Sequence, residues 1–395
     1  MEELLFALAG CFLGIFTGLT PGIHVNTVSL VALGFLGQGN TGFIAMVASM
    51  SVVHTFVDFV PSILLGSPDD ETFLGVLPGH RMLLKGRGFE AVGLTVAGGL
   101  FAGLLSIALS PLFVLALEKA DALLPAIIPF ALAIILISMA LDERKKLSGI
   151  AVILLSAALG MVALEGNLAL KEPLLCLATG FFGASTLVDS IAKNPGIVGQ
   201  KKKEFRFSPG GAFGKSLVAF LGGCLVSVMP GIGASQAAFI ARKALGKMGT
   251  KGYLVLLGGV NTSTMILSFF VLYSIGKART GSAVAISQMG SFGLNQLLVV
   301  VGACLLGIGF GAIATTLVAV KAAGIISKLD YRKLNAIVLA VVSAVVAVFS
   351  GTAGLAFYGV ACAIGLVSIR QGTKRSGCMS FLIVPTIAHY AAGFL

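Results

Sequence analysis

Long apolar runs separated by short charged loops dominate this chain, and no soluble domain is visible between them. Most runs reach about 18 residues, the length that a helix needs to cross a bilayer. Hydrophobic residues make up 57% of the sequence and charged residues 11%, and the mean hydropathy is +1.03. No basic segment precedes the first run, so we read it as part of the mature fold and not as a cleaved signal. The sequence therefore predicts an all-α polytopic membrane protein.

The apolar runs form two sets of six. The first set comprises residues 4–36, 41–66, 90–117, 122–141, 147–164 and 174–191. The second set comprises residues 211–241, 253–275, 292–322, 334–350, 353–369 and 377–394. Six basic loops lie around them, at residues 81–87, 142–146, 193–206, 242–251, 321–333 and 370–375. Because lysine and arginine in short loops favour the cytoplasm, the net charge of +11 reports membrane topology, and no nucleic-acid partner is expected.

The loop charges predict a re-entrant hairpin in the second half. Loops 193–206 and 242–251 enclose a single run, and both are cytoplasmic only if that run enters the membrane and returns. In the first half the acidic residues Glu2 and Glu3 favour the outside, so residues 4–36 become the inverted partner of this hairpin. We therefore expect two inverted-topology repeats, each with one re-entrant Pro-Gly hairpin plus about five transmembrane helices.

The domain organisation follows from these repeats. Residues 1–192 form the N-terminal inverted repeat, residues 193–210 a basic cytoplasmic linker, and residues 211–395 the C-terminal inverted repeat. We expect a multi-pass protein of the cell membrane, with its N-terminus outside. Two other topologies remain open: twelve plain spanning helices, or one broken crossing at 4–36 combined with one more crossing at 71–84.

One tripeptide interrupts both hairpin segments, as Pro21-Gly22-Ile23 and as Pro230-Gly231-Ile232, 209 positions further on. Proline removes a backbone donor and glycine permits positive φ, so each break frees N–H groups at membrane depth, where a half-helix end attracts a carboxylate. Matching breaks in two halves indicate the substrate site of a secondary transporter. The expected substrate-binding residues are Thr20, Gly22, Asn26, Thr27, Gly231, Gly233, Ser235 and Gln236. The alternative is that Pro-Gly only kinks two ordinary helices, because the same pair also occurs in a charged loop at Pro195.

A second polar group follows each hairpin segment. His54 and Asp58 are four residues apart and share a helix face. Ionisable residues inside a membrane are functional candidates by default, and a His-Asp pair can relay a proton, while hydroxyl and amide oxygens suit Na⁺. The candidate ion-coupling residues are His54, Asp58, Asn261, Thr262, Ser263 and Thr264. A structural hydrogen bond between helices is the alternative for His54.

Two cations lie in the second half where the predicted topology places the outside. Lys277 and Arg279 run against the positive-inside trend, which suggests capture of an anion. An accidental pair of loop cations is the other interpretation, and it is the one that we favour.

Three stretches resemble the large membrane (permease) subunit family of tripartite tricarboxylate transporters: Gly18-x-x-Pro21-Gly22-Ile23, Pro230-Gly231-Ile232-Gly233, and the segment from Pro61 to Gly66. The segment from Ser67 to Arg81 looks most like a shorter, archaeal-type branch of that family. The resemblance implies an ion-coupled permease for small organic anions such as di- or tricarboxylates, with inverted halves and the substrate held at the Pro-Gly hairpins. It also implies a small membrane subunit and an extracytoplasmic binding protein as partners.

The predicted function is therefore symport of an organic anion, with alternating access between one hairpin-bearing bundle and a scaffold formed by the remaining helices. The partners considered are that anion, the lipid bilayer, a second copy of the chain in a homodimer, and the two subunits named above. No cofactor is expected beyond a coupling Na⁺ or H⁺, because the six cysteines are scattered and no metal-ligand spacing occurs. An intramembrane enzyme is the first alternative, although the sequence lacks Gly-x-Ser-x-Gly and His-Glu-x-x-His motifs. A transporter or channel for a solute that is not a carboxylate is the second.

Overall fold

The computed structural model describes most of the chain. The described residues are 2–20, 25, 28–29, 32–33, 40–65, 73–166, 170–193, 199–200, 209–229, 233–234, 237–238, 241, 248–326 and 330–392, without the side chains of 73–77, 209–212, 326 and 331. Within these ranges every regular element is a helix, and nine helices are long and apolar enough to cross a membrane. The predicted all-α, multi-pass class is confirmed.

The first half of the sequence supplies most of the shorter helices. They are α1 (Glu2–Leu19), α3 (Thr41–Val57), α4 (Phe59–Leu64), α5 (Phe73–Leu83), α6 (Gly88–Ala108), α7 (Ser110–Ala120), the 3₁₀ turn η1 (Asp121–Leu123), α8 (Leu124–Leu141), α9 (Lys146–Leu164), α10 (Pro173–Ala178), the π-helical η2 (Thr179–Ala184) and α11 (Ser185–Lys193). At about 1.5 Å per residue, α5 is only about half as long as the hydrocarbon thickness, so it does not cross the membrane by itself.

The second half contains the longest helices. They are α12 (Pro209–Val228), α14 (Thr250–Ile275), α15 (Gly281–Ser287), α16 (Leu294–Ile326), α17 (Tyr331–Gln371), the 3₁₀ turn η3 (Arg375–Met379) and α18 (Ser380–Ala392). The two runs predicted at 334–350 and 353–369 are joined in α17, where Gly351 has a φ of 67° and a ψ of −164°. Glycine tolerates this backbone, which interrupts the helix between the two predicted crossings.

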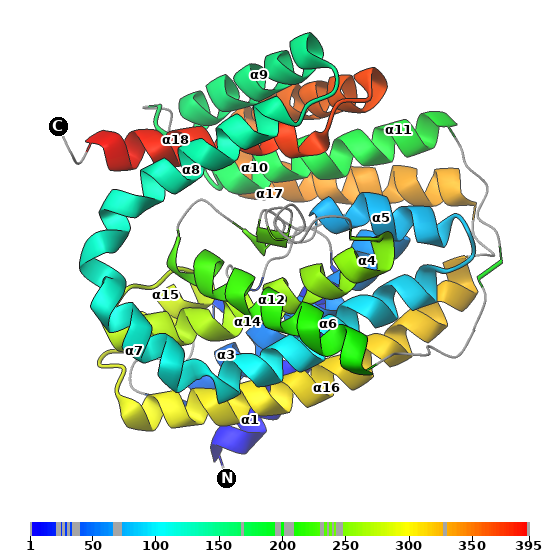
Figure 1. Cartoon of the computed structure of the whole chain (residues 1–395). Coiled ribbons are helices and arrows are strands. Elements are labelled where there is room, and N and C mark those ends of the chain that lie inside the picture. The colour runs from blue at the N-terminus through cyan, green and yellow to red at the C-terminus, as the bar shows by residue number, and fades with distance from the viewer. Residues whose placement is uncertain are drawn as a thin grey trace.

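The helices pack into two bodies (Figure 1). Body A contains α1, α3, α4, α5, α6, α7, α12, α14, α15 and α16, and body B contains α8, α9, α10, η2, α11, α17, η3 and α18. All extensive contacts between described helices lie within one body, except those of η1, which contacts both α7 and α8. In Figure 1 body B forms the upper layer. Each body therefore draws its helices from both halves of the sequence.

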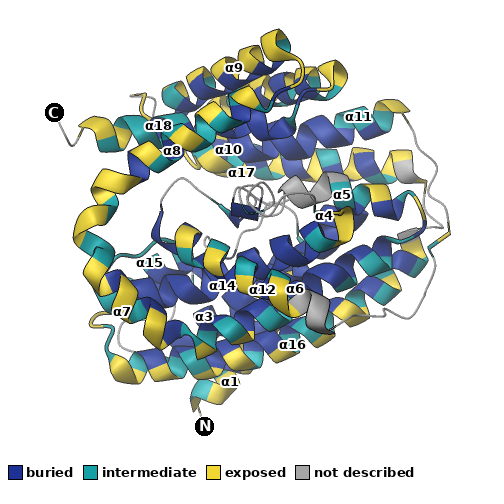
Figure 2. Ribbon diagram, in the orientation of Figure 1, coloured by how far each residue is buried: buried dark blue, intermediate teal, exposed yellow. Residues whose placement is uncertain are grey.

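Two buried spans form the centre of body A. One runs through α3 and α4, where the described residues are buried from Gly42 to Leu64, and the other is α14, buried from Tyr253 to Leu272 (Figure 2). Neighbouring helices approach them through glycine. A Cβ added at Gly98 of α6 would lie 1.9 Å from the backbone oxygen of Val255 in α14. Close backbone contact of this kind is typical of helix packing in membranes, where small residues supply the interface.

The outer surface carries the apolar stripes that a bilayer requires. On α8 the exposed side chains recur every three or four residues, the spacing of one helix face (Figure 2). They are Ile127, Phe130, Ile134, Ile137 and Leu141. Large apolar residues on a continuous exposed face are expected next to lipid, so α8 presents this face to the hydrocarbon.

Candidate functional site

Buried polar side chains meet at the centre of body A. They belong to α3, to Asp58, which directly follows α3, and to α14. Nδ2 of Asn261 donates a hydrogen bond to Oδ2 of Asp58 at 2.9 Å and lies 3.4 Å from the backbone oxygen of Thr55. The hydroxyl oxygens of Thr55 and Thr262 are 3.1 Å apart. All four side chains are at most 3% exposed. We call Thr55, Asp58, Asn261 and Thr262 the central polar layer; it unites three of the predicted ion-coupling residues, from both halves of the chain.

The helix is interrupted at the central polar layer. α3 ends at Val57 and α4 begins at Phe59, so Asp58 lies at the break. Pro61 has no N–H to donate to the backbone oxygen of Val57, four residues before it. The proline therefore removes one helical hydrogen bond beside the Asp58 carboxylate, and it accounts for the break.

The C-terminal end of α1 lies against this break. Thr17 places its Oγ1 3.0 Å from Nδ1 of His54, and the His54 side chain is buried. A Cβ added at Gly18 would lie 2.7 Å from the Val57 Cβ and 3.1 Å from the Asp58 nitrogen. Thr20, two residues on, donates its hydroxyl to the backbone oxygen of Phe16 at 2.8 Å. The described end of α1 therefore lies beside the central polar layer.

The second half repeats this arrangement around α12 and α14. A Cβ added at Gly223 of α12 would lie 2.4 Å from the Cβ of Ser263. Ser263 donates its hydroxyl to the backbone oxygen of Ala102 at 3.3 Å. The Oδ1 of Asn261 and the Oγ1 of Thr264 are buried without a hydrogen-bond partner among the described residues. These two oxygens leave acceptor capacity for a ligand beside the central polar layer.

α1 and α3 run in the same direction and in register. Near their N-terminal ends, Thr41 donates its hydroxyl to Oε1 of Glu3 at 3.2 Å. Near their C-terminal ends, Gly18 packs against Val57. Leu19 at the end of α1 and Thr41 at the start of α3 therefore lie at opposite ends of this helix pair.

α12 and α14 are parallel in the same way. Gly252, near the start of α14, lies against the side chain of Lys215 in α12, and a Cβ there would approach Cε of Lys215 to 2.9 Å. Towards the other end, Gly223 lies against Ser263. The described part of the chain after α12 includes Gly233, whose backbone oxygen accepts a hydrogen bond from the nitrogen of Ala237 at 3.2 Å, the spacing of a helical turn.

The remaining candidate substrate residues fall outside the described residues. They are Gly22, Asn26, Thr27, Gly231, Ser235 and Gln236. The role of these six residues stays a prediction. Of the eight predicted substrate-binding residues, only Thr20 and Gly233 have a described position.

The surroundings of His54 and Asp58 do not suit an intramembrane hydrolase. The His54 side chain is 2% exposed and the Asp58 side chain 3%, and both lie between packed helices. A hydrolase would need both in a wet cavity beside a nucleophile. No group of three His, Cys, Asp or Glu side chains that could hold a metal occurs among the described residues.

Lys277 has a structural partner. Its Nζ lies 2.5 Å from Oδ1 of Asp121 in η1, the turn that links the two bodies. Both side chains are partly exposed, so the pair contributes about 0–1 kcal/mol. This ion pair gives Lys277 a structural role that neither interpretation of the sequence included.

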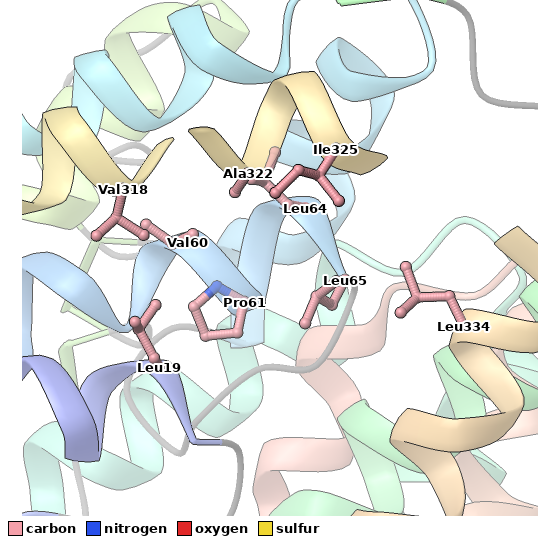
Figure 3. Close-up of a pocket in the computed structure, with 9 residues that line it drawn as sticks. All are labelled: Leu19, Val60, Pro61, Leu64, Leu65, Val318, Ala322, Ile325 and Leu334. Atoms are coloured by element: carbon pink, nitrogen blue, oxygen red, sulfur yellow. The ribbon is translucent and has the colours of Figure 1, made fainter. Parts of the chain in front are cut away.

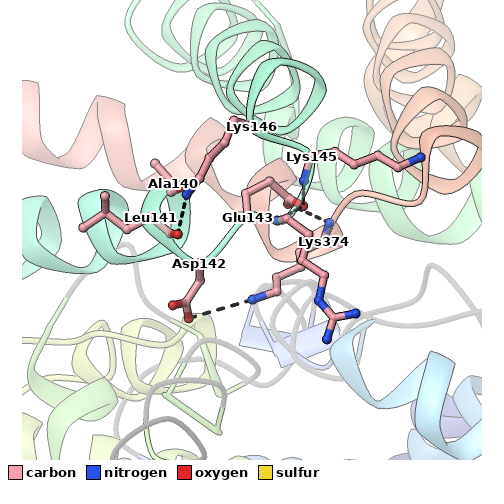
Figure 4. A network of polar contacts seen from close by, with 8 residues as sticks. Ala140, Leu141, Asp142, Glu143, Lys145, Lys146 and Lys374 are labelled. Carbon is pink, nitrogen blue, oxygen red and sulfur yellow. Dashed lines mark hydrogen bonds and ion pairs between the residues drawn. The ribbon is translucent and has the colours of Figure 1, made fainter.

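Basic loops that the sequence predicts to share one side lie close together in the structure. In body B, Oε2 of Glu143 accepts a hydrogen bond from the Lys374 nitrogen at 2.8 Å, which joins loop 142–146 to loop 370–375 (Figure 4). The same carboxylate accepts from the nitrogen of Arg144 at 2.9 Å, and Asp142 lies 3.9 Å from the Lys374 ammonium. The two loops are therefore on the same side of the molecule.

Three more basic loops meet at the N-terminal end of α6. Gln200 accepts from the nitrogen of Gly88 at 2.9 Å and donates to the backbone oxygen of Leu83 at 3.0 Å. Glu90 pairs with Lys251 at 2.8 Å and with Arg87 at 2.7 Å. Residues before and after the run 211–241 consequently contact one short segment, residues 83–90.

A buried arginine in body B was not expected from the sequence. Arg375 is 6% exposed, and its guanidinium donates to the backbone oxygens of Phe181 and Phe182 at 2.6 and 3.0 Å, and to the hydroxyls of Ser185 and Thr186 at 2.7 and 2.5 Å. Burial lowers the pKa of this guanidinium to about 10, so it stays protonated at neutral pH. The contacts fix η3 to the π-helical turn η2. A basic residue in a loop gave no sequence signal for this role, because such residues usually face solvent.

Comparisons with known proteins agree with the geometry. The model of the tripartite tricarboxylate transporter TctA family matches residues 4–380. The chain is similar to the "Uncharacterized protein MJ1079" of Methanocaldococcus jannaschii, with 29% identity over 410 residues and with the whole of both chains covered. No solved structure matches the chain. A family match over nearly the whole sequence, on a multi-pass helical fold, establishes that the chain belongs to the TctA family of tripartite tricarboxylate transporters, a transporter family and not an enzyme family.

Proposed function

We propose that this protein is an ion-coupled secondary transporter for small organic anions such as di- or tricarboxylates, which it holds between two Pro-Gly hairpins at the centre of body A. The observation that carries the proposal is the central polar layer, which lies between two buried spans and beside the C-terminal end of α1. Polar and ionisable groups at this depth are costly in a membrane and usually mark the pathway of a substrate or an ion.

The parallel pairs support the two hairpins. Since α1 and α3 begin side by side at Glu3 and Thr41, the run that starts with α1 has to return to the side on which α1 begins. The same argument applies to the segment between α12 and α14. Gln200 and Lys251, one before and one after that segment, both contact residues 83–90. A single broken crossing would leave the two ends of each segment on opposite sides of the membrane.

The helix boundaries support inverted repeats. Helix starts in the two halves differ by a nearly constant number: 209 − 2 = 207 for α12 and α1, 331 − 124 = 207 for α17 and α8, and 380 − 173 = 207 for α18 and α10. The Thr55 and Thr262 hydroxyls, also 207 positions apart, are in contact. A contact between equivalent residues is expected on the pseudo-two-fold axis of an inverted repeat.

The division into two bodies supports alternating access. Body A carries the central polar layer and both helices that lead into the Pro-Gly segments, and body B has no extensive contact with these helices among the described residues. In our proposal body A is the hairpin-bearing bundle, and it moves against body B, which acts as the scaffold. The chain passes between the bodies three times, from α7 to α8, from α11 to α12 and from α16 to α17, and in our proposal the turn η1 between α7 and α8 acts as a hinge.

Ion coupling is assigned to the polar residues around the central layer. Asp58 and His54 are the ionisable members of the group, and Asn261, Thr262, Ser263 and Thr264 supply amide and hydroxyl groups. A carboxylate with amide and hydroxyl oxygens suits Na⁺, and the His-Asp pair suits a proton. A small membrane subunit and an extracytoplasmic binding protein are the proposed partners, in line with the tripartite family, and a homodimer is a further proposal.

Uptake into proteoliposomes tests the proposed function. Purified protein is reconstituted, and a panel of labelled mono-, di- and tricarboxylates is supplied under a Na⁺ gradient alone and under a proton gradient alone. We expect uptake of at least one di- or tricarboxylate to follow one of the two gradients. Substitutions Gly22→Leu and Gly231→Leu are expected to abolish that uptake. Gly309→Leu is the matched control, because no atom lies near a Cβ at Gly309; unchanged uptake in the first two variants would contradict the hairpin site.

A further inference from the structure

An apolar cavity lies at the junction of the two bodies, where α16 ends and α17 begins. Its volume is about 300 Å³, and all nine of its described lining residues are apolar (Figure 3). Leu334 of α17 is the lining residue from body B, and the others, such as Pro61 and Ala322, belong to body A. An apolar cavity offers water no hydrogen-bond partners and therefore favours hydrocarbon.

The cavity opens towards the lipid-facing surface of α16. Ile325 lines the cavity and is nevertheless 57% exposed. Ile313 and Leu317, on the same helix, are also largely exposed. An apolar helix surface of this kind faces acyl chains in a bilayer, so the mouth of the cavity is accessible to lipid.

Three cations lie close in the sequence to residues of α16 and α17 that line the cavity. Lys321 lies three residues after Val318 and four before Ile325, which places it on the cavity-lining face of α16. Arg332 and Lys333 directly precede Leu334 on α17. All three cations are exposed. The acidic residue of this turn, Asp330, lies 3.9 Å from the Lys333 ammonium, and its carboxylate also caps α17.

We propose that the cavity binds an acyl chain of an anionic phospholipid, whose headgroup phosphate is held by Lys321, Arg332 and Lys333. The apolar lining selects a hydrocarbon chain, and the excess of positive charge at the mouth selects the headgroup. Basic clusters beside membrane spans recognise anionic lipids in this way. A neutral phospholipid would fill the same cavity but would gain nothing from the three cations. Preference for an anionic over a neutral headgroup is therefore the property that identifies the site.

The absence of tryptophan from the chain permits a direct test. Ile325→Trp introduces a single fluorophore at the exposed mouth, and the protein is reconstituted into phosphatidylcholine vesicles that contain either brominated phosphatidylglycerol or brominated phosphatidylcholine. At equal mole fraction we expect quenching by the anionic lipid to exceed quenching by the neutral lipid by about two-fold or more. The matched control is Ile134→Trp on the lipid-facing side of α8, where equal quenching by the two lipids is expected.

Removal of the charges completes the test. In the Ile325→Trp background, the combined substitutions Lys321→Gln, Arg332→Gln and Lys333→Gln are expected to abolish the preference, and they alter only exposed side chains. Equal quenching before the charges are removed, or a preference that survives their removal, would overturn the proposal. A second measurement avoids the fluorophore: by native mass spectrometry the otherwise unaltered protein should retain more phosphatidylglycerol than the triple variant, and equal retention would also overturn it.

Discussion

The hydroxyl oxygens of Thr55 and Thr262 lie 3.1 Å apart, although 207 residues separate them in the sequence. Beside them Asn261 donates to Asp58 at 2.9 Å, so polar contacts in the central polar layer join the two halves of the chain. Interhelical hydrogen bonds in membranes contribute only about 0.6 kcal/mol on average. Such contacts are too weak to account for placing a carboxylate in a buried span, and the first prediction therefore concerns transport and not stability.

Asp58→Asn is expected to reduce ion-driven uptake by about ten-fold or more, which corresponds to ~1.4 kcal/mol. The amide has the size of the carboxylate but lacks the negative charge that a coupling cation or proton needs. The thermal unfolding midpoint should change little, because Asn at this position still accepts a hydrogen bond from Asn261. Initial uptake rates under separate Na⁺ and proton gradients, together with unfolding curves in detergent, measure both effects.

Ser51→Ala provides the matched control for this variant. Ser51 donates to Oγ of Ser282 at 2.8 Å, which is another buried contact between the halves but lies outside the central polar layer. We expect its uptake to stay near that of the unaltered protein. The prediction fails if Ser51→Ala loses as much uptake as Asp58→Asn, or if Asp58→Asn keeps the ion dependence of the unaltered protein.

Gly98→Ala is expected to separate α6 from α14. Its Cβ would lie 1.9 Å from the backbone oxygen of Val255, a distance that only a shift of the helix backbone can relieve. Overpacking of this kind costs about 1–3 kcal/mol. The unfolding midpoint should therefore fall, and Gly302→Ala, where a Cβ meets open space on α16, should leave it unchanged. A similar midpoint for both variants would show that the α6–α14 interface is not closely packed.

Local patterns in the sequence predicted much of the fold and of the site. The length of an apolar run predicts a membrane span, and a polar residue within such a run can be recognised in the sequence without knowledge of its partner. For this reason Asp58 and Asn261 were both identified as candidates. Their contact was not predicted, because it joins residues 203 positions apart through packing that no local pattern encodes. The division into two bodies was expected only in outline, for the same reason.

Other features depend on tertiary contacts that composition does not reveal. The ion pair of Lys277 with Asp121 joins two loops 156 positions apart, so charge alone left the role of Lys277 open. The short length of α5 was also not evident from apolar runs, which mark hydrophobic length and not helix ends. The interruption of α17 at Gly351, in contrast, lies between two runs that the sequence separates, 334–350 and 353–369. The Pro-Gly segments are the opposite case: the sequence predicts their role, but most of their residues lie outside the described part of the chain.

Arg375→Lys is expected to destabilise body B. Lysine keeps the charge but lacks the planar fork that reaches the Phe181 and Phe182 carbonyls and the Ser185 hydroxyl together. Each buried acceptor left without a donor costs about 1–3 kcal/mol. A lower unfolding midpoint is the expected result, and Lys374→Gln, at the partly exposed neighbouring residue, should have little effect. Equal midpoints for the two variants would mean that the arginine does not hold η3 to the π-helical turn.

Single-cysteine labelling tests the inverted hairpins, because it shows on which side of the membrane each end of a hairpin lies. In a chain without its native cysteines, we expect Asn40→Cys to react with a membrane-impermeant maleimide added outside, because Asn40 caps α3 on the side where α1 begins. Gln200→Cys and Lys251→Cys should react only from the cytoplasmic side, since both residues contact the segment 83–90. Labelling of Asn40→Cys from the inside would show that residues 4–36 cross the membrane once as a broken helix and do not form a hairpin. Labelling of Gln200→Cys and Lys251→Cys from opposite sides would exclude the second hairpin, because the run between them would then cross the membrane once.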